Sequence, residues 1–458
     1  MLESSTHVWA GPSVDLLRLH ENNPARYPFL LESAGGEISA INRYSLLLAF
    51  PEHSLTLNHD GLFDGSQQLD ETDFLQRLDR QWHQHWLSSE RLNPEQPFNG
   101  GWFVYLGYEL AEQIEPSLKL PRAESTLPIA LAVRCPAAVV IDHQLNQLSV
   151  FAEPDHQDAA NMLAQMLDDL KLASEQDIES SSPSVERVSE DPDANFVNSV
   201  ARIQEYLLNG DVFQVNLSRK WVVQCIEQPS AAGLYRNLRR ANPAPFAGLF
   251  NWHKHAVISS SPERLVQVRG RDVQTRPIAG TRPRKDFDEA ERNALIGHPK
   301  ERAEHIMLID LERNDLGRVC EPGSVQVDEL LGLESYAHVH HIVSNVRGRL
   351  RDTASPLDAL RAVFPGGTIT GCPKVRCMQI IAELEAEGRG PYTGAMGYLD
   401  RGGNMDMNIL IRSLELQDKN IIFRAGAGIV ADSVAGDELQ ETRAKAAGLL
   451  KSLGLSDA

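Results

Sequence analysis

Apolar and polar positions follow two different periods along this chain, and the period changes many times. Apolar residues recur at helical spacing in 158–172, 356–364 and 374–388, and each of these segments predicts a helix. The segment 131–152 has the short apolar runs and the turn that are typical of paired strands. Because helices and strand signals alternate irregularly, the pattern predicts an α+β fold with antiparallel β-sheets.

The second half of the chain continues in the same way. The segment 196–225 predicts a helix, a Gly-Asp break and then a strand, and 286–317 has a helical period. Two apolar segments, 408–417 and 420–432, are predicted as strands, and 436–454 as the last helix. No internal repeat is visible.

One segment, 173–195, differs from the rest in being acidic, rich in serine and without apolar periodicity. Such a composition buries little apolar surface and predicts an exposed linker. The linker would separate an N-terminal region, 1–172, from a C-terminal region, 196–455.

Composition limits the classes of partner and compartment. The net charge is −19, which disfavours binding to nucleic acid or to an anionic membrane. Five scattered cysteines do not form a disulfide pattern, and Cys372 and Cys377 lack the neighbours of a zinc site. The N-terminus has no signal-peptide pattern and no apolar run is long enough to span a membrane. We therefore expect a soluble, cytoplasmic protein.

Two pairs of glutamates are candidate metal ligands. Glu301 and Glu304 lie three residues apart on one predicted helix, and Glu438 and Glu441 lie three apart on another. Residues at this spacing share a helix face. Four carboxylates from two helices would suit Mg²⁺, which prefers oxygen ligands and keeps several waters. The spacing alone is equally consistent with two pairs of glutamates that simply face the solvent.

Candidate anion-binding groups come from glycine-rich segments and one arginine. The segments 366–371 and 425–428 could bring backbone N–H groups close to a carboxylate, or could simply be turns and strand contacts. Arg412, in an apolar predicted strand, needs a partner, which is either a structural carboxylate or that of a substrate. The sequence has neither a nucleophilic serine elbow nor the cysteine and histidine motifs of a glutaminase.

A series of motifs resembles the chorismate-utilising enzymes, which include anthranilate, aminodeoxychorismate, isochorismate and salicylate synthases. In chain order the motifs are SSPERL (260–265), RPIAGTRPR (276–284), ERAEHIMLIDLERNDLGRV (301–319), HVHHIVS (338–344), FPGGTITGCPKVR (364–376), GAMGYLD (394–400), NILIRS (408–413), AGAGIVADS (425–433) and ELQETRAKA (438–446). The resemblance implies the fold of the anthranilate synthase large subunit, in which antiparallel sheets pack as a sandwich with helices outside.

The resemblance also implies roles for individual residues. Glu263 matches the general acid that helps the C4 hydroxyl of chorismate to leave, which requires a raised pKa. His341 matches a histidine beside the ring, and Tyr398 and Arg412 match the pair that holds the enolpyruvyl carboxylate. Thr368, Gly426, Gly428 and Lys445 match further substrate contacts. Glu301, Glu304, Glu438 and Glu441 match the ligands of the Mg²⁺ that grips the ring carboxylate.

Other positions concern the choice of reaction within this family. Gln214 stands where the water-adding members have a lysine, so ammonia is the expected nucleophile, supplied by a separate glutaminase subunit. Asn216 and His340 favour the aminodeoxychorismate synthases, whose product leads to para-aminobenzoate and folate. Ala279 instead follows the anthranilate synthases, because the usual aminodeoxychorismate synthase has a nucleophilic lysine there. Anthranilate synthesis and a non-catalytic binding homologue remain the alternatives.

Glu32 and Ser33, in LLES (30–33), resemble the tryptophan-contacting motif of the feedback-inhibited anthranilate enzyme. A tryptophan site and an ordinary strand end are both consistent with this match.

Overall fold

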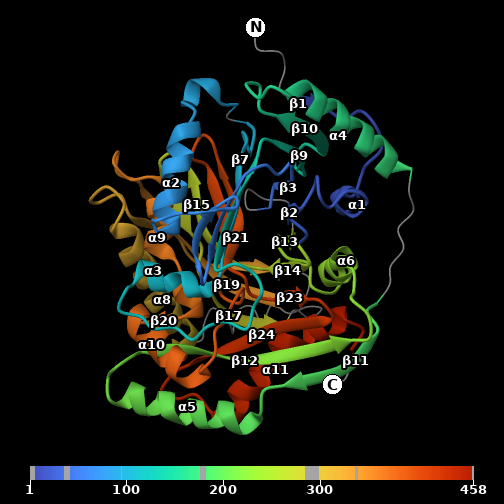
Figure 1. Cartoon of the computed structure of the whole chain (residues 1–458). Coiled ribbons are helices and arrows are strands. Elements are labelled where there is room, and N and C mark those ends of the chain that lie inside the picture. The colour runs from blue at the N-terminus through green and yellow to red at the C-terminus, as the bar shows by residue number, and fades with distance from the viewer. Residues whose placement is uncertain are drawn as a thin grey trace.

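The computed structural model describes residues 6–35, 42–93, 95–175, 182–283, 299–335 and 339–455, and for 89, 279–283, 299–301, 335, 339 and 340 it describes the backbone only. Two large antiparallel sheets form the centre of the molecule, and helices cover their outer faces (Figure 1). The α+β sandwich expected from the sequence is confirmed.

The first sheet has twelve strands among the described residues. In spatial order these are β1 (Thr6–Val8), β10 (Gln147–Ala152), β9 (Ala137–Asp142), β3 (Tyr44–Ala49), β2 (Phe29–Glu32), β13 (Phe246–Trp252), β14 (His255–Ser261), β23 (Ser413–Gln417), β24 (Asn420–Ile429), β12 (Gln214–Cys225) and β11 (Val185–Glu190), with β20 (Gly371–Cys372) beside β12.

The second sheet also has twelve strands in the described part of the chain. Their order is β17 (Ile278–Pro283), β19 (Val339–Arg349), β16 (Asp272–Thr275), β15 (Arg264–Arg269), β22 (Met405–Asn408), β21 (Ala395–Asp400), β7 (Gly101–Leu106), β8 (Ala130–Cys135), β4 (Ser54–Asn58), β5 (Gly61–Asp64) and β6 (Gln67–Gln68), with β18 (Gln326–Ser335) beside β19.

The helices divide between the two sheets. The α-helices are α1 (Leu16–Asn22), α2 (Phe74–His85), α3 (Ala111–Ile114), α4 (Ala159–Ser174), α5 (Asp193–Leu208), α6 (Ala231–Ala241), α8 (Pro299–Gly317), α9 (Pro356–Val363), α10 (Lys374–Glu385) and α11 (Ala435–Ser452), and the 3-10 turns are η1 (Ser89–Arg91), η2 (Tyr108–Leu110) and η3 (Gly367–Ile369). Helices α1, α4, α6 and α11 share a core with the first sheet, and α2, α8 and α9 share one with the second. No helix among the described residues is long and apolar enough to cross a membrane.

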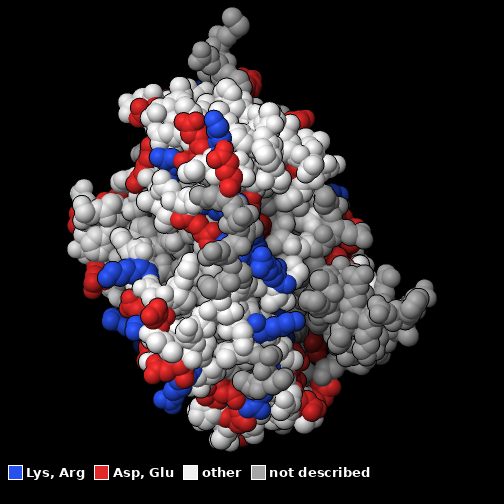
Figure 2. All heavy atoms as spheres, turned by 90° about the vertical axis from the view of Figure 1, so that its right-hand side faces the viewer, with Lys and Arg blue, Asp and Glu red and all other residues white. Residues whose placement is uncertain are grey.

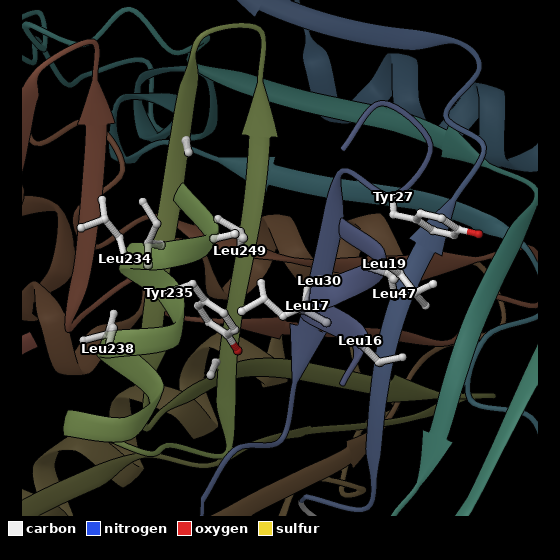
Figure 3. Packing of buried hydrophobic residues seen from close by; sticks show 14 of the residues in the cluster. Leu16, Leu17, Leu19, Tyr27, Leu30, Leu47, Leu234, Tyr235, Leu238 and Leu249 are labelled. Atoms are coloured by element: carbon white, nitrogen blue, oxygen red, sulfur yellow. The ribbon is translucent and has the colours of Figure 1, made fainter. Parts of the chain in front are cut away.

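The core of the first sheet shows why the outer helices stay in place. Figure 3 shows α1 and α6 directing their apolar side chains at leucines of β2, β3 and β13. Leu17, Leu30, Leu47 and Leu249 are fully buried there. Burial of each leucine side chain contributes about 1.5–3 kcal/mol, so this contact anchors the helices firmly. On the surface, acidic and basic side chains are interspersed across the face in Figure 2.

Two predictions from the sequence need correction. Residues 185–190, expected to be linker, form β11, which pairs with β12 through its backbone. Residues 176–181 of that linker lie outside the described residues. Both sheets combine strands from before and after this segment, so 1–172 and 196–455 do not form separate sheets. The predicted strand 408–417 is also interrupted, because β22 ends at Asn408 and β23 begins at Ser413.

Candidate active site

The candidate site lies where the chain crosses twice from one sheet to the other. Glu263 lies between β14 of the first sheet and β15 of the second, and Arg412 lies between β22 of the second sheet and β23 of the first. The crossings run side by side, because β14 pairs with β23 and β15 pairs with β22. The Ile409 N–H donates to the Glu263 carbonyl oxygen at 3.0 Å and ties them together. This topology brings Glu263 and Arg412 to one region, although 148 residues lie between them.

Glu263 is the carboxyl group best placed to act as an acid. Its side chain is 4% exposed, and the Thr368 hydroxyl, carried by η3, donates a hydrogen bond of 2.8 Å to Glu263 Oε1. Burial raises the pKa of Glu263 to about 8, with a further contribution from the negative charge of Glu312. Glu263 therefore keeps its proton at neutral pH, as the role implied by the resemblance requires.

Arg412 provides a positive charge with a restrained backbone. Its φ is 53°, a left-handed conformation that a side-chain-bearing residue adopts only when the surrounding structure imposes it. The guanidinium donates to the Lys445 carbonyl oxygen at 2.8 Å. Burial lowers the pKa of Arg412, while Tyr392 and Glu441 act in the opposite direction, but the guanidinium stays charged. Such a cation is suited to hold a substrate carboxylate.

Lys445 lies one turn along α11 from Glu441. Its Nζ forms an ion pair of 2.6 Å with Glu441 and donates to the Gly426 carbonyl oxygen at 2.9 Å. The contact places the ammonium group at the edge of β24, close to the glycine-rich strand that the sequence singled out.

Strands β12 and β24 form a polar wall of the site. Val215 and Leu217 face the core beneath α5 and α10, so the alternating residues Gln214 and Asn216 lie on the opposite face. Gln214 Oε1 and Asn216 Oδ1 are buried and have no hydrogen-bond partner among the described residues. Both oxygens are acceptors, so an N–H or O–H donor of a bound molecule would satisfy them.

Glycines on β24 leave space next to these amides. A Cβ on Gly428 would clash with the Gln214 amide nitrogen, and a Cβ on Gly426 would lie 2.8 Å from Asn216 Oδ1 and 2.9 Å from the Tyr392 hydroxyl oxygen. At Gly426 a Cβ would also lie 2.8 Å from the Leu217 carbonyl oxygen, so glycine is required there, whereas at Gly428 a side chain would displace the Gln214 amide. The glycine backbone at both positions can approach a ligand closely.

Tyr398 does not accompany Arg412, contrary to the role implied by the resemblance. It lies on β21, where its hydroxyl accepts a hydrogen bond of 2.6 Å from Arg269, and it lines a different cavity. Tyr392, six residues earlier, takes the expected place. It is 8% exposed, its hydroxyl lies by Gly426, and it acts electrostatically on Arg412. Both tyrosines belong to the stretch PYTGAMGY, and only the fold distinguishes them.

The expected metal ligands lie on two different helices. Glu304 and Glu438 are half-buried on α8 and α11, and Glu441 is paired with Lys445. The side chain of Glu301 lies outside the described residues, as do those of Ala279 and His340. Within the described part, no group of three or more potential ligand side chains forms a metal site. His341 is buried on β19, at 7% exposure.

Glu32 and Ser33 line a separate cavity of about 1130 Å³ between the sheets. The Glu32 carboxylate accepts hydrogen bonds from Tyr235 at 2.6 Å and Arg239 at 3.1 Å, and Ser33 Oγ donates to the Tyr44 carbonyl oxygen at 2.9 Å. The residues that line this cavity do not include Glu263 or Arg412. The two residues thus lie apart from the acid and the arginine.

Glu312 is a buried acid that the sequence did not single out. It lies on α8, is 5% exposed, and has a pKa raised by burial and by the charge of Asp315. In the sequence it is one of many charged residues in a helix, and nothing in the helical period identifies it as buried.

Comparison with known proteins extends the resemblance to almost the whole chain. The family described as chorismate binding enzyme matches residues 27–451. An anthranilate synthase component I-like protein of Synechocystis is 42% identical over 363 residues, covering 78% of this chain and 73% of that protein. Aminodeoxychorismate synthase component 1 of Bacillus subtilis is 39% identical over 383 residues, covering 81% of this chain and 80% of that protein.

A solved structure supports the same assignment. Anthranilate synthase component I of Streptococcus pneumoniae superposes with a TM-score of 0.81 at 33% identity, covering 90% of this chain and 93% of that one. The match of the family to most of the chain, the sequence relatives and this shared fold agree, and the chain belongs to the chorismate binding enzyme family.

Proposed function

We propose that this chain is component I of an aminodeoxychorismate synthase, which converts chorismate and ammonia to 4-amino-4-deoxychorismate and water. The observation that carries the proposal is the buried Glu263 carboxyl group, whose pKa is raised to about 8 beside Thr368. A poor leaving group such as hydroxide departs readily only when an acid protonates it. Glu263 donates its proton to the 4-hydroxyl oxygen, the C4–O bond breaks, and water leaves.

Ammonia as the nucleophile is supported by the polar wall. Gln214 cannot act as a base, and a water molecule would need one to become a strong nucleophile, whereas ammonia does not. The unpartnered oxygens of Gln214 and Asn216 accept hydrogen bonds from N–H donors. They can therefore hold ammonia or take up the N–H groups of the new amine. The new C–N bond uses the nitrogen lone pair, and the amine then releases a proton.

The two carboxylates of chorismate require positive charge. Arg412 and Tyr392 are suited to hold the enolpyruvyl carboxylate, with Lys445 and the backbones of Gly426 and Gly428 close by. The ring carboxylate is assigned to Mg²⁺, which neutralises it and orients the ring when bound.

The residues proposed to hold Mg²⁺ are Glu301, Glu304, Glu438 and Glu441. Carboxylate oxygens suit this ion, and because it takes only one or two carboxylates directly and keeps several waters, no cluster of three side chains is needed. Glu441 would exchange its pairing with Lys445 for the ion. EDTA should abolish turnover and added Mg²⁺ should restore it, and full activity in metal-free buffer would contradict this part.

A second candidate function is anthranilate synthesis. Ala279 favours it, because no lysine is present there to react at C2. If ammonia added at C2 and pyruvate left, the product would be anthranilate. The relative from Synechocystis is named after that enzyme, and the relative from B. subtilis after the other.

Product analysis separates the candidates. The purified chain should be incubated with chorismate, Mg²⁺ and an ammonium salt, without any lyase, and the products assayed by chromatography together with pyruvate. We expect 4-amino-4-deoxychorismate with its enolpyruvyl group retained, and no pyruvate. Anthranilate with stoichiometric pyruvate would replace the first candidate by the second, and unchanged chorismate would reject both.

The source of ammonia is a further part of the proposal. A separate glutaminase subunit is expected, since the chain lacks the motifs of that activity. Glutamine should therefore be inert with the purified chain, while ammonium salts support turnover at alkaline pH, where free ammonia is more abundant. Hydrolysis of glutamine by the chain alone would contradict the need for a partner.

A further inference from the structure

A second buried carboxyl group, that of Glu312, lies close to Glu263 and takes no part in the chemistry proposed above. We propose that Glu312 is a positioning residue for Glu263, acting through the turn that carries Thr368 and through its negative charge. The inference rests on the proposed function only where it treats Glu263 as the acid of the reaction. Its physical content is a coupling between two buried carboxyl groups, which can be measured without substrate.

The first route from Glu312 to Glu263 runs through the backbone of η3. Helix α8 packs against η3, and the Gly367 N–H faces the Glu312 carboxylate and stabilises its charged form. Gly367 permits this approach, since a Cβ there would lie 3.3 Å from Glu312 Oε1 and would clash with the Leu311 side chain. The next residue, Thr368, donates the hydrogen bond of 2.8 Å to Glu263. Glu312 thereby helps to set where the Thr368 hydroxyl points.

The second route is the charge of Glu312 itself. Lys374, whose positive charge acts to lower the pKa of Glu312, is already engaged by Asp315 Oδ2 at 2.5 Å and by the Val363 carbonyl oxygen at 2.9 Å. Asp315 also accepts a hydrogen bond of 3.1 Å from Arg318. Glu312 therefore has no cation of its own among the described residues.

On the side of Glu263, the positive charge of Lys445 acts to lower the pKa of the carboxyl group, but Lys445 is itself paired with Glu441. Other charged or titratable groups on the packed elements include Arg264, which is paired with Asp406 at 2.8 Å, and Arg313, which is paired with Asp310 at 2.8 Å. They also include His305, whose Nε2 is hydrogen-bonded to Ser344 Oγ at 2.7 Å, and His341 on β19. Two buried carboxyl groups with so little free positive charge nearby cannot both ionise easily. The negative charge of Glu312 thus favours the protonated form of Glu263.

Infrared titration of the free protein tests this coupling. The C=O bands of the protonated carboxyl groups can be assigned by their loss in Glu263→Gln and Glu312→Gln. In Glu312→Gln, which keeps an oxygen for the Gly367 N–H, the Glu263 band should disappear at a pH roughly one unit lower than in the wild type, the lower end of the effect of a nearby like charge. An unchanged midpoint would overturn the proposal.

Two further variants and the wild type make the test robust. Glu415→Gln removes another buried carboxyl group, 7% exposed on β23 and hydrogen-bonded to Ser125, and should leave the Glu263 midpoint unchanged. Glu312→Met removes the charge with an apolar side chain of similar length and should give the same lowering as the glutamine variant. In the wild type the Glu263 band should fade over a wider pH range than one isolated group gives. A single-site curve there would contradict the coupling even if neither Glu312 variant folded.

Turnover supplies a separate readout. In Glu312→Gln the alkaline limb of the rate profile should move down by the same amount as the infrared midpoint, with little change in KM for chorismate. A uniform loss of rate with no shift of that limb would indicate a merely structural role and overturn the proposal. If the infrared shift were present and no amination could be measured in the wild type, the proposed function would fail while the coupling stood.

Discussion

Replacing Glu263 by glutamine should make the protein more stable at alkaline pH, although it should abolish turnover. The pKa of this buried group is raised from 4.5 to about 8, so in that interval the unfolded chain has already lost a proton that the folded chain retains. The group therefore costs nothing below about pH 4.5, and its cost grows up to about pH 8. At about 1.4 kcal/mol for each pH unit, the full cost is roughly 3 to 5 kcal/mol. Glutamine keeps the size and neutrality of the protonated acid and removes this cost.

The assay is denaturant unfolding of the wild type and Glu263→Gln at about pH 5 and about pH 9. These two pH values enclose most of the range between the pKa of Glu263 in the unfolded chain and its pKa in the folded protein. The variant should gain little at the lower pH and most of the predicted amount at the higher one. Glu205→Gln, on the exposed surface of α5, serves as the control and should show the same small difference at both pH values. An equal effect of Glu263→Gln at both pH values would refute the raised pKa and the argument for the acid.

Three substitutions test the remaining contacts. Thr368→Val removes the hydrogen bond to Glu263, which is worth about 1.5–3 kcal/mol to a charged acceptor, so the alkaline limb of the pH–rate profile should move up by roughly one to two pH units. Thr370 is in the same turn but bonds to the Gly366 carbonyl oxygen, so Thr370→Val should not move that limb. Arg412→Lys replaces a two-point contact by one, and should lower kcat/KM for chorismate about 10- to 100-fold, with stability nearly unchanged. Tyr392→Phe should raise KM several-fold without moving the pH profile; an unaltered KM would remove Tyr392 from the site.

Local pattern was enough to predict much of the fold. The helices α9, α10 and α11 follow directly from apolar spacing, and α9 also begins at a capping box formed by Ser355 and Asp358. The break in 408–417 could not be predicted in this way. The residues before and after the break are apolar, because the chain leaves one buried sheet there and enters the other. The left-handed backbone at Arg412 is imposed only by the tertiary structure.

The linker prediction was wrong for a similar reason. Residues 185–190 are polar since β11 is an edge strand, partnered by β12 on one side and exposed over much of its surface. An edge strand can be held by backbone hydrogen bonds, which leave no trace in the pattern of side chains. The polar composition of 185–190 therefore predicted correctly that these residues are exposed, but it predicted incorrectly that they form no regular structure.

In the site, too, the sequence motifs identified chemical groups but did not determine where each side chain lies. Glu263 and Arg412 were identified from their motifs, and the structure brings both to the crossings between the sheets. The sequence analysis paired Tyr398 with Arg412 and did not consider Tyr392, which the structure places beside Gly426, because a motif gives no direction for a side chain. Burial of Glu312 depends on the contact of α8 with η3, which joins residues more than 50 positions apart.

The separation of acid and cation within the site has a consequence for substrate binding. Lys445 already acts to lower the pKa of Glu263, and a bound carboxylate beside Arg412 and Lys445 would offset that positive charge. Binding of the dianion should then favour the protonated acid still more. Linkage makes this reciprocal, so the protein with protonated Glu263 binds the substrate more tightly by the same factor. Glu263 is thereby most fully protonated in the substrate complex, where its proton is needed. If Arg412 were in direct contact with Glu263, the guanidinium would hold the carboxylate ionised, and substrate binding would no longer favour the protonated acid.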